Sequence, residues 1–176
     1  YALELDNGSR DNVISGNTFR DLGGGGLKVS GGDATRMTSL RTGNNFITDN
    51  HLYGLGQILH QSVGILARHT DNNVIKHNHL HDMDWVGISV GWVWGYSESV
   101  AVGNRIEYNK LHDIGMGFLN DHGAIYLLGP APGTAVSNNL IYDIHGSFGI
   151  YPDEGSAQLL IENNVVFDTC SYGLRQ

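Results

Sequence analysis

Ionisable side chains gather beside two short apolar stretches that repeat each other in the second half of the chain. Asp121 and His122 precede an Ala-Ile-Tyr stretch, whereas Asp153 and Glu154 follow a Gly-Ile-Tyr stretch that lies 25 residues further on. Two neighbouring carboxylates are what hydrolysis of a glycosidic bond requires, one as the acid and the other as the nucleophile or base. The candidate catalytic residues are therefore Asp121 and Asp153, and Glu154 is the alternative candidate for either position. Both acidic segments also fit a simpler role as turns or loops that flank strands.

Aromatic side chains near these acids are candidates for holding a sugar. The segment 91–96 places three aromatic residues within six positions, at or beyond the end of an expected strand. Aromatic faces at a groove stack on sugar rings, although the same residues can instead cap a hydrophobic gap, and exposed tyrosines can form a stabilising ladder. The candidate substrate-binding residues are Arg68, Trp92, Trp94, Tyr96, His122, Tyr126 and Tyr151.

An internal repeat supplies the elements that would position these residues. The pattern Asn-x-apolar-x-Asp begins at Asn17, Asn78, Asn109, Asn139 and Asn164, with a variant at Asn50. A Gly-aliphatic or similar strand follows each unit, and the second residues of these strands are Leu27, Ile65, Ile88, Ile125, Ile150 and Leu174. Their spacings of 38, 23, 37, 25 and 24 define a period of about 24 with two enlarged coils. This period predicts an all-β, right-handed parallel β-helix of about six to seven coils.

The inward asparagines of such a coil form ladders along its axis. Each amide can bond to the equivalent amide above and below and satisfy backbone groups that the turn leaves unpaired. A second series, at Asn12, Asn45, Asn73 and Asn104, continues with Thr134 and Leu159 in the two later coils.

Because the side chains of a strand alternate between its two faces, we expect Tyr126, Tyr151 and Asp153 to point outward from one parallel sheet. Arg68, two coils away, is expected on the same outer face. Asp121, however, lies four residues before the level of Ile125, and Asp153 lies three residues after it. A straight strand would separate the two carboxylates by roughly 23 Å. The pair can act together only if the chain bends at His122-Gly123 or the 115–120 loop folds back over the sheet.

Three alternating histidines raise the question of a metal site. His77, His79 and His81 are expected to share one face of a strand, and imidazole is a good ligand for zinc or copper. Their roots are nearly 7 Å apart, and no carboxylate or cysteine completes a recognisable set, so we expect a solvated polar face and no metal site. The acidic composition is compatible with calcium, but the sequence does not locate a site, and no other cofactor is indicated.

Composition excludes other classes of function. The chain of 176 residues has a formal net charge of −8 and no basic stripe, which argues against nucleic-acid binding. No apolar run approaches the roughly 20 residues of a membrane-spanning helix. We expect one domain over residues 1–176, as a piece of a longer β-helix, because 173–176 resembles the start of another strand. The oligomeric state is not indicated.

Residues 85–176 carry a more specific resemblance. The segments Leu119-Asn-Asp-His-Gly-Ala-Ile-Tyr126, Leu128-Gly-Pro-x-Pro-Gly-Thr134 and Gly149-Ile-Tyr-Pro-Asp-Glu-Gly-Ser156 are similar to those of glycoside hydrolase family 141, which has a pectate-lyase-like β-helix. The chain departs from the family pattern at His122, Ala124 and Pro152. The resemblance implies a secreted or periplasmic enzyme that cleaves plant cell-wall glycans as a fucosidase or xylanase, with Asp121 and Asp153 as the catalytic pair.

Two other functions fit the same pattern. A polysaccharide lyase would need a base and a cation beside the substrate carboxylate, and Arg68 is the basic residue expected on the outer strip. A non-catalytic β-helix that binds glycans or serves as a surface spacer needs no catalytic pair. In each glycan-binding case the expected partner is an oligosaccharide or polysaccharide.

Overall fold

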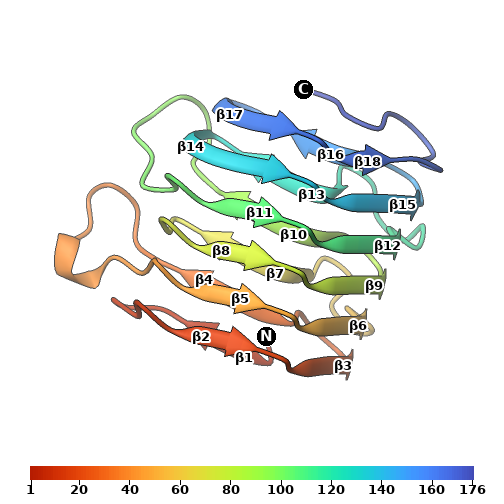
Figure 1. Ribbon diagram of the computed structural model, residues 1–176, viewed down its shortest axis with the longest axis horizontal. Coiled ribbons are helices and arrows are strands. Elements are labelled where there is room, and N and C mark those ends of the chain that lie inside the picture. The colour runs from red at the N-terminus through yellow and green to blue at the C-terminus, as the bar shows by residue number, and fades with distance from the viewer.

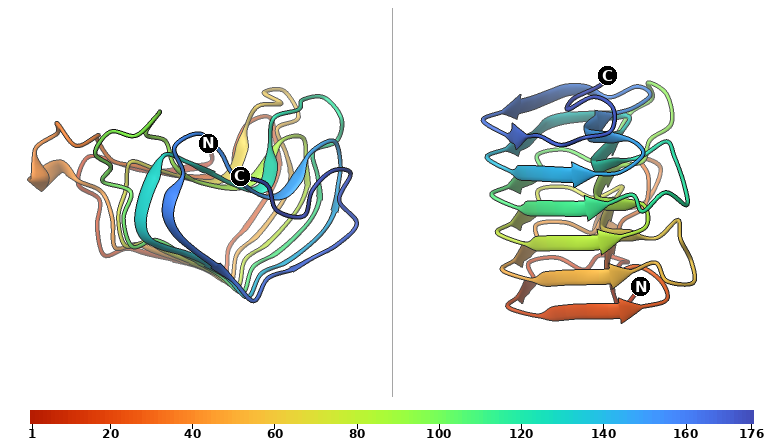
Figure 2. Two further views of the ribbon diagram at one scale, coloured as in Figure 1. Left: turned by 90° about the horizontal axis from the view of Figure 1, so that it is seen from above. Right: turned by 90° about the vertical axis from the view of Figure 1, so that its right-hand side faces the viewer.

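The computed structural model describes residues 1–176 as a stack of coils built from three parallel β-sheets (Figure 1). Each coil is a three-sided loop when it is viewed along the stack, and equivalent strands of successive coils lie one above the other (Figure 2). Each sheet contains six strands, and Ile150 bridges Leu174 of a further, partial coil. The predicted parallel β-helix of six to seven coils is confirmed.

The strands of a coil run in the order sheet I, sheet II, sheet III. Sheet I contains β1 (Leu3–Leu5), β4 (Leu27–Ser30), β7 (Val63–Arg68), β10 (Val86–Gly91), β13 (Gly123–Leu128) and β16 (Phe148–Pro152). Sheet II contains β2 (Val13–Ser15), β5 (Phe46–Thr48), β8 (Val74–Lys76), β11 (Arg105–Glu107), β14 (Pro130–Ser137) and β17 (Ala157–Glu162). Sheet III contains β3 (Thr18–Leu22), β6 (His51–Leu55), β9 (His79–Met83), β12 (Lys110–Ile114), β15 (Leu140–Ile144) and β18 (Val165–Val166). A single 3₁₀ turn, η1 (Thr38–Leu40), lies in the first enlarged coil.

The register of sheet I matches the sequence repeat residue by residue. The equivalent positions are Leu27, Ile65, Ile88, Ile125, Ile150 and, through an isolated bridge, Leu174. Aliphatic side chains at these positions fill the interior of the coil, and the main core cluster contains 23 buried residues drawn from all three sheets. Burial of this aliphatic stack is the main driving force for folding.

Asparagine ladders run through the two corners of sheet II. In the longer ladder, each amide oxygen accepts hydrogen bonds from the backbone and side-chain nitrogens of the asparagine one coil earlier, through Asn17, Asn50, Asn78, Asn109, Asn139 and Asn164. The other ladder ends as predicted, because the backbone N–H of Asn104 donates to Thr134 Oγ1 at 3.3 Å. Both predicted ladders are confirmed.

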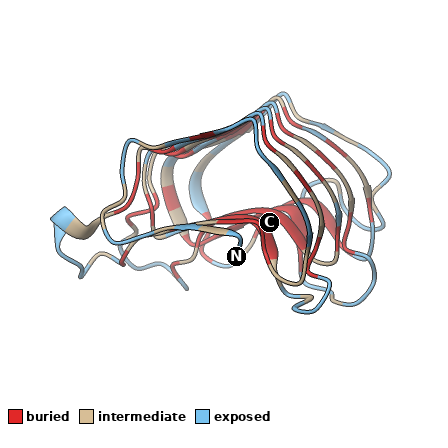
Figure 3. Ribbon diagram, turned by 90° about the horizontal axis from the view of Figure 1, so that it is seen from below, coloured by how far each residue is buried: buried red, intermediate tan, exposed pale blue.

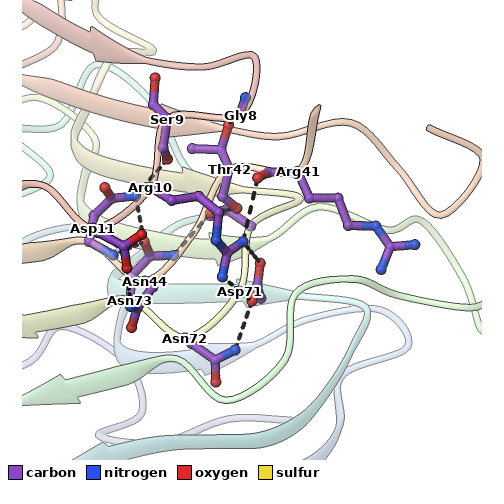
Figure 4. Close-up of polar contacts among 12 residues, drawn as sticks. Gly8, Ser9, Arg10, Asp11, Arg41, Thr42, Asn44, Asp71, Asn72 and Asn73 are labelled. Atoms are coloured by element: carbon purple, nitrogen blue, oxygen red, sulfur yellow. Dashed lines mark hydrogen bonds and ion pairs between the residues drawn. The ribbon is translucent and has the colours of Figure 1, made fainter. Parts of the chain in front are cut away.

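An ion pair joins the first and third coils beside the shorter ladder (Figure 4). Arg10 Nη1 and Nη2 lie 2.9 and 3.1 Å from the two carboxylate oxygens of Asp71. Gly43 of the second coil lies between them and pairs with both backbones, so the arginine side chain spans a position that has no side chain. Burial disfavours ionisation of Asp71, but hydrogen bonds from Arg10 and Asn72 outweigh it and lower the pKa of Asp71.

The last three strands of sheet I are buried on both faces. Residues of β10, β13 and β16 are buried along the full length of each strand (Figure 3). Their inward side chains join the main core, whereas outward side chains form a second cluster with Leu66, Leu128 and Phe148. The longest connections of the coil leave from the two ends of this sheet (Figure 2). Among the helical segments, none has the length and apolar character needed to cross a membrane.

Candidate functional site

The candidate site lies on the outer face of sheet I. One outward ladder runs through Leu66, Ser89, Tyr126 and Tyr151, and the bridge of Ile150 to Leu174 places Arg175 at the next level. The predicted outward orientation of the two tyrosines is confirmed, because their rings pack in the outer cluster and contact each other at 5.5 Å between centroids.

Each tyrosine hydroxyl of this pair donates a hydrogen bond to one of the two candidate catalytic aspartates. Tyr126 Oη lies 2.6 Å from Asp153 Oδ2, and Tyr151 Oη lies 3.3 Å from Asp121 Oδ1. Because the two rings contact each other, both carboxylates lie at one tyrosine pair, although they come from opposite ends of neighbouring strands. The structure therefore brings Asp121 and Asp153 together.

A bend before β13 produces this convergence. Asp121 has a left-handed backbone conformation with φ of 55°, so the chain does not enter β13 in a straight line. The indole N–H of Trp85 donates to the carbonyl oxygen of Asn120 at 3.3 Å, and the N–H of His122 donates to Ser147 Oγ at 3.2 Å. These contacts hold the end of the 115–122 connection against sheet I. The separation of roughly 23 Å expected for a straight strand does not apply.

The environment keeps both tyrosines protonated. Burial, followed by the hydrogen bond to Asp153, raises the pKa of Tyr126 far above its usual range. Burial and the neighbouring Asp153 and Asp121 raise the pKa of Tyr151 to about 12. At neutral pH both hydroxyls are therefore donors, and their hydrogen bonds fix the position of the two aspartates.

Glu154 and Tyr96 line a cavity at one end of the aspartate pair. The cavity has a volume of about 430 Å³ and is also bordered by Tyr151, Asp153 and Arg175. Glu154 is exposed, and Tyr96 is 84% exposed. The chain leaves β10 and crosses two coils, because Gly95 packs closely against Gly155, which follows β16. Tyr96 therefore lies two coils away from the end of β10. An open, polar cavity beside two carboxylates can admit a hydrophilic ligand.

The other predicted aromatic residues divide into an inner and an outer group. Trp92 is partly buried, donates its indole N–H to Ser89 Oγ at 2.9 Å and lies 6.2 Å from the Tyr126 ring. The Arg68 guanidinium lies over Trp92 at 5.9 Å, as a cation–π contact. Trp94 is 65% exposed and borders a separate cavity of about 410 Å³ together with Trp92 and His69. Trp92 therefore supports the tyrosine pair, whereas Trp94 has a free aromatic face.

Long connections form walls at both ends of sheet I. At one end, the His60 ring stacks on Phe118 at 4.5 Å, which joins the 56–62 and 115–122 connections. At the other end, the 31–42 and 92–104 connections contribute the border of the 410 Å³ cavity through Asp33 and Glu98. We call the outer face of sheet I, with these connections at its two ends, the trough, and both cavities lie along it.

The structure corrects the placement of two histidines. His122 is fully buried, and its Nε2 donates to the carbonyl oxygen of His145 at 3.1 Å, so it cannot contact a ligand in the trough. His77 does not share a face with His79 and His81, because β9 begins at His79 and His77 has φ of 54°. Continuing the strand alternation through this turn was wrong.

Three further residues of the site were missed from the sequence. Trp85 and Phe148 border the tyrosine pair, with ring centroids 6.4 Å from Tyr126 and 4.7 Å from Tyr151 respectively. Arg175 lies 5.0 Å from the Phe148 ring and borders the 430 Å³ cavity. The repeat contained the signal for Arg175, because it follows the inward Leu174 by one residue. Trp85 and Phe148 depend on the loop conformation, which the repeat does not specify.

Comparison with known proteins agrees with this architecture. The family model described as "Right handed beta helix region" matches residues 1–176. The chain belongs to the right-handed β-helix family. No curated protein sequence is significantly similar to it.

Two solved structures are similar to this β-helix. One, titled "Glycoside hydrolase", has a TM-score of 0.84 and 24% identity over 92% of the chain. The other, titled "The complex structure of XylC with xylose", has a TM-score of 0.66 and 17% identity over 95% of the chain. The β-helix described here spans 30% and 22% of the lengths of those chains. At these identities the similarity establishes the shared fold.

Proposed function

We propose that the trough on sheet I binds a glycan and that Asp121 and Asp153 hydrolyse its glycosidic bond. The observation that carries this proposal is the convergence of the two carboxylates on the Tyr126–Tyr151 pair. A pair of carboxylates on opposite sides of the scissile bond is the minimal machinery of most glycoside hydrolases. The titles of both similar structures, which name a glycoside hydrolase and a xylose complex, support a glycan as the ligand.

The hydrogen bonds distinguish the environments of the two acids. Asp153 accepts a short bond of 2.6 Å from the more deeply buried tyrosine, whereas the bond to Asp121 is longer, at 3.3 Å. The shorter bond holds Asp153 more firmly as an acceptor, which suits a nucleophile or base, whereas the longer bond leaves Asp121 freer to give up a proton. In this proposal Asp153 acts as the nucleophile or base, and Asp121 acts as the acid. Glu154, at the edge of the cavity, is the alternative candidate for either role.

The surroundings of the pair suit a sugar chain. Tyr96 and Trp94 expose aromatic faces on the loop beside the trough, and polar side chains border both cavities. Stacking of sugar rings on exposed aromatics together with polar contacts is a common mode of sugar binding. Xylose-containing and fucose-containing polysaccharides of plant cell walls are the first substrates to test, and such an enzyme would act outside the cell or in the periplasm.

Release of reducing sugar from xylan and from fucosylated cell-wall polysaccharide tests the proposal. Asp121→Asn and Asp153→Asn should each lower the rate at least about a hundredfold. Glu162→Gln, which changes an exposed acid outside the trough, is the matched control and should retain the parent rate. Circular dichroism checks that each variant keeps its β-sheet content. Parent-like activity in both aspartate variants would exclude these roles.

Arg175 favours one alternative reaction. A polysaccharide lyase needs a cation near the substrate carboxylate and a base near the proton on the adjacent carbon, and Arg175 borders the same cavity as Asp153. A lyase leaves an unsaturated uronide that absorbs in the ultraviolet, whereas hydrolysis leaves no such product. Ultraviolet-absorbing products from a uronic acid polysaccharide would favour the lyase. Glycan binding with no product from any polysaccharide would favour a non-catalytic β-helix.

A further inference from the structure

A cluster of four histidines lies on the outer face of sheet III, away from the trough. His51 belongs to β6, His79 and His81 belong to β9, and His112 belongs to β12. The register aligns His51 with His79 and aligns His81 with His112, so the four rings occupy two adjacent ladders on three successive coils. All four side chains are partly buried.

The ring nitrogens of the two ladders face each other. His51 Nε2 lies 2.8 Å from His81 Nε2, and His79 Nε2 lies 2.8 Å from His112 Nε2. One ligating nitrogen from each of His51, His79 and His81 lies within 4.8 Å of the other two. Two Zn–N bonds of 2.0–2.1 Å at a tetrahedral angle place their nitrogens about 3.3 Å apart. Small rotations of the three rings would therefore accommodate one ion.

A carboxylate orients one of these rings for ligation. His81 Nδ1 lies 2.7 Å from Asp82 Oδ2, so this nitrogen carries the proton and Nε2 presents its lone pair. Metal-ligating histidines commonly donate their second nitrogen to a carboxylate in this way. Asp82 has φ of 52°, and Asp113 of the next coil has φ of 51° and makes the same bond to His112 Nδ1, at 2.6 Å.

We propose that His51, His79 and His81 bind a zinc ion or another first-row divalent metal, with water in the fourth position. Imidazole nitrogens suit these metals, whereas calcium and magnesium prefer oxygen ligands. On binding, the metal replaces the proton that His51 shares with His81, and that proton moves to His51 Nδ1 or to solvent. His112 Nδ1 lies 2.6 Å from Asp113 Oδ2, so His112 Nε2 accepts the proton of His79 Nε2, and His79 ligates either through its free Nδ1 or through Nε2 after that proton moves to Nδ1.

Stacking of the rings alone is the competing explanation for this cluster. His81 and His112 stack at 4.9 Å with an interplanar angle of 3°, in a ladder that continues through Tyr53 on one side and Tyr142 on the other. Such a ladder would stabilise the sheet without a metal. Hydrogen bonds of His51 with His81 and of His79 with His112 would complete such a metal-free cluster, so saturable metal binding is the result that distinguishes the two explanations.

Titration calorimetry of the whole chain with zinc chloride, in a buffer that does not chelate metals, tests the proposal. The expected result is one saturable site, with binding at least about tenfold weaker in His79→Gln and His81→Gln. His77→Gln is the matched ligand control, because the His77 ring contacts Tyr108, 5.4 Å away between centroids, and Asp49, which lie outside the cluster. Replacement of zinc by Co²⁺ should give the intense visible absorption of a tetrahedral complex.

The Asp82→Asn variant distinguishes the loss of His81 ring orientation from the loss of the fold. Asparagine tolerates the left-handed conformation, so this variant should fold and yet bind zinc about tenfold more weakly. Asp143→Asn changes the equivalent aspartate of a later coil, with φ of 51° and a preceding tyrosine, and should bind zinc like the parent. Absence of saturable binding, or equal loss in the His77→Gln and His79→Gln variants, would overturn the metal site and leave the stacking ladder.

Discussion

Substitution of the buried Asn78 by Ala should destabilise the β-helix more than substitution of an exposed asparagine by Ala does. Asn78 Oδ1 accepts bonds from the backbone and side-chain nitrogens of Asn50, both at 3.0 Å. Its Nδ2 donates to the carbonyl oxygen of Ile47 at 2.8 Å and to Asn109 Oδ1 at 3.0 Å. Four hydrogen bonds at about 1 kcal/mol each predict a loss of about 4 kcal/mol, because water cannot replace them at a site that is 1% exposed.

Urea denaturation monitored by circular dichroism measures this loss. The matched control is Asn17→Ala, which removes the exposed first member of the same ladder and should cost less than about 1 kcal/mol. A loss of about 4 kcal/mol is a large part of the 5–15 kcal/mol that stabilises a typical domain, so Tm should fall by about 10 °C. If the Asn78 variant lies within 1 kcal/mol of the parent, or both variants lose equally, the ladder does not stabilise the coil as argued.

Two further predictions concern a tight corner and a buried histidine. Gly43→Ala should destabilise the chain by about 1–3 kcal/mol, because a Cβ atom would lie 2.5 Å from the Asp71 carbonyl oxygen. Gly24→Ala, whose Cβ would meet no atom closer than 3.8 Å, is the control, and equal urea midpoints for the two variants would contradict the clash. Burial lowers the pKa of His122 below that of the unfolded chain, so the unfolded state takes up the proton first and stability falls as pH drops below about 6.5. His122→Gln should therefore show a smaller loss of urea midpoint than the parent between pH 7.5 and 5.5, and parallel curves would refute this assignment.

The repeat made the interior of the molecule predictable. Each Gly-aliphatic pair occupies the same level of sheet I in every coil, so the spacing from Leu27 to Leu174 gave the register directly. The asparagine ladders followed for the same reason, because a buried amide at a repeated turn has equivalent amides as its partners. Interior positions are constrained by burial and hydrogen bonding in every coil, and this constraint appears in the sequence as periodicity.

The site was less predictable because it depends on the connections between strands. Asp121 reaches Tyr151 through a left-handed residue and a loop held by Trp85, and neither feature follows from the spacing of the coils. The alternation rule also failed at His77, where a turn interrupts the extended backbone. Loops have no repeated partner that would force a single conformation, so their contacts depend on individual side chains.

The histidine cluster shows a general property of this architecture. Along one strand, the roots of His79 and His81 are about 7 Å apart, and from this spacing we expected no metal site. The third proposed ligand, His51, comes from the adjacent coil, at a spacing of about 4.8 Å, which is shorter than the distance between alternate residues of a strand. Outward positions at one level are also free to vary, because the core does not specify them. In a β-helix, functional groups are therefore assembled across coils, and aligned repeats reveal them better than any single strand does.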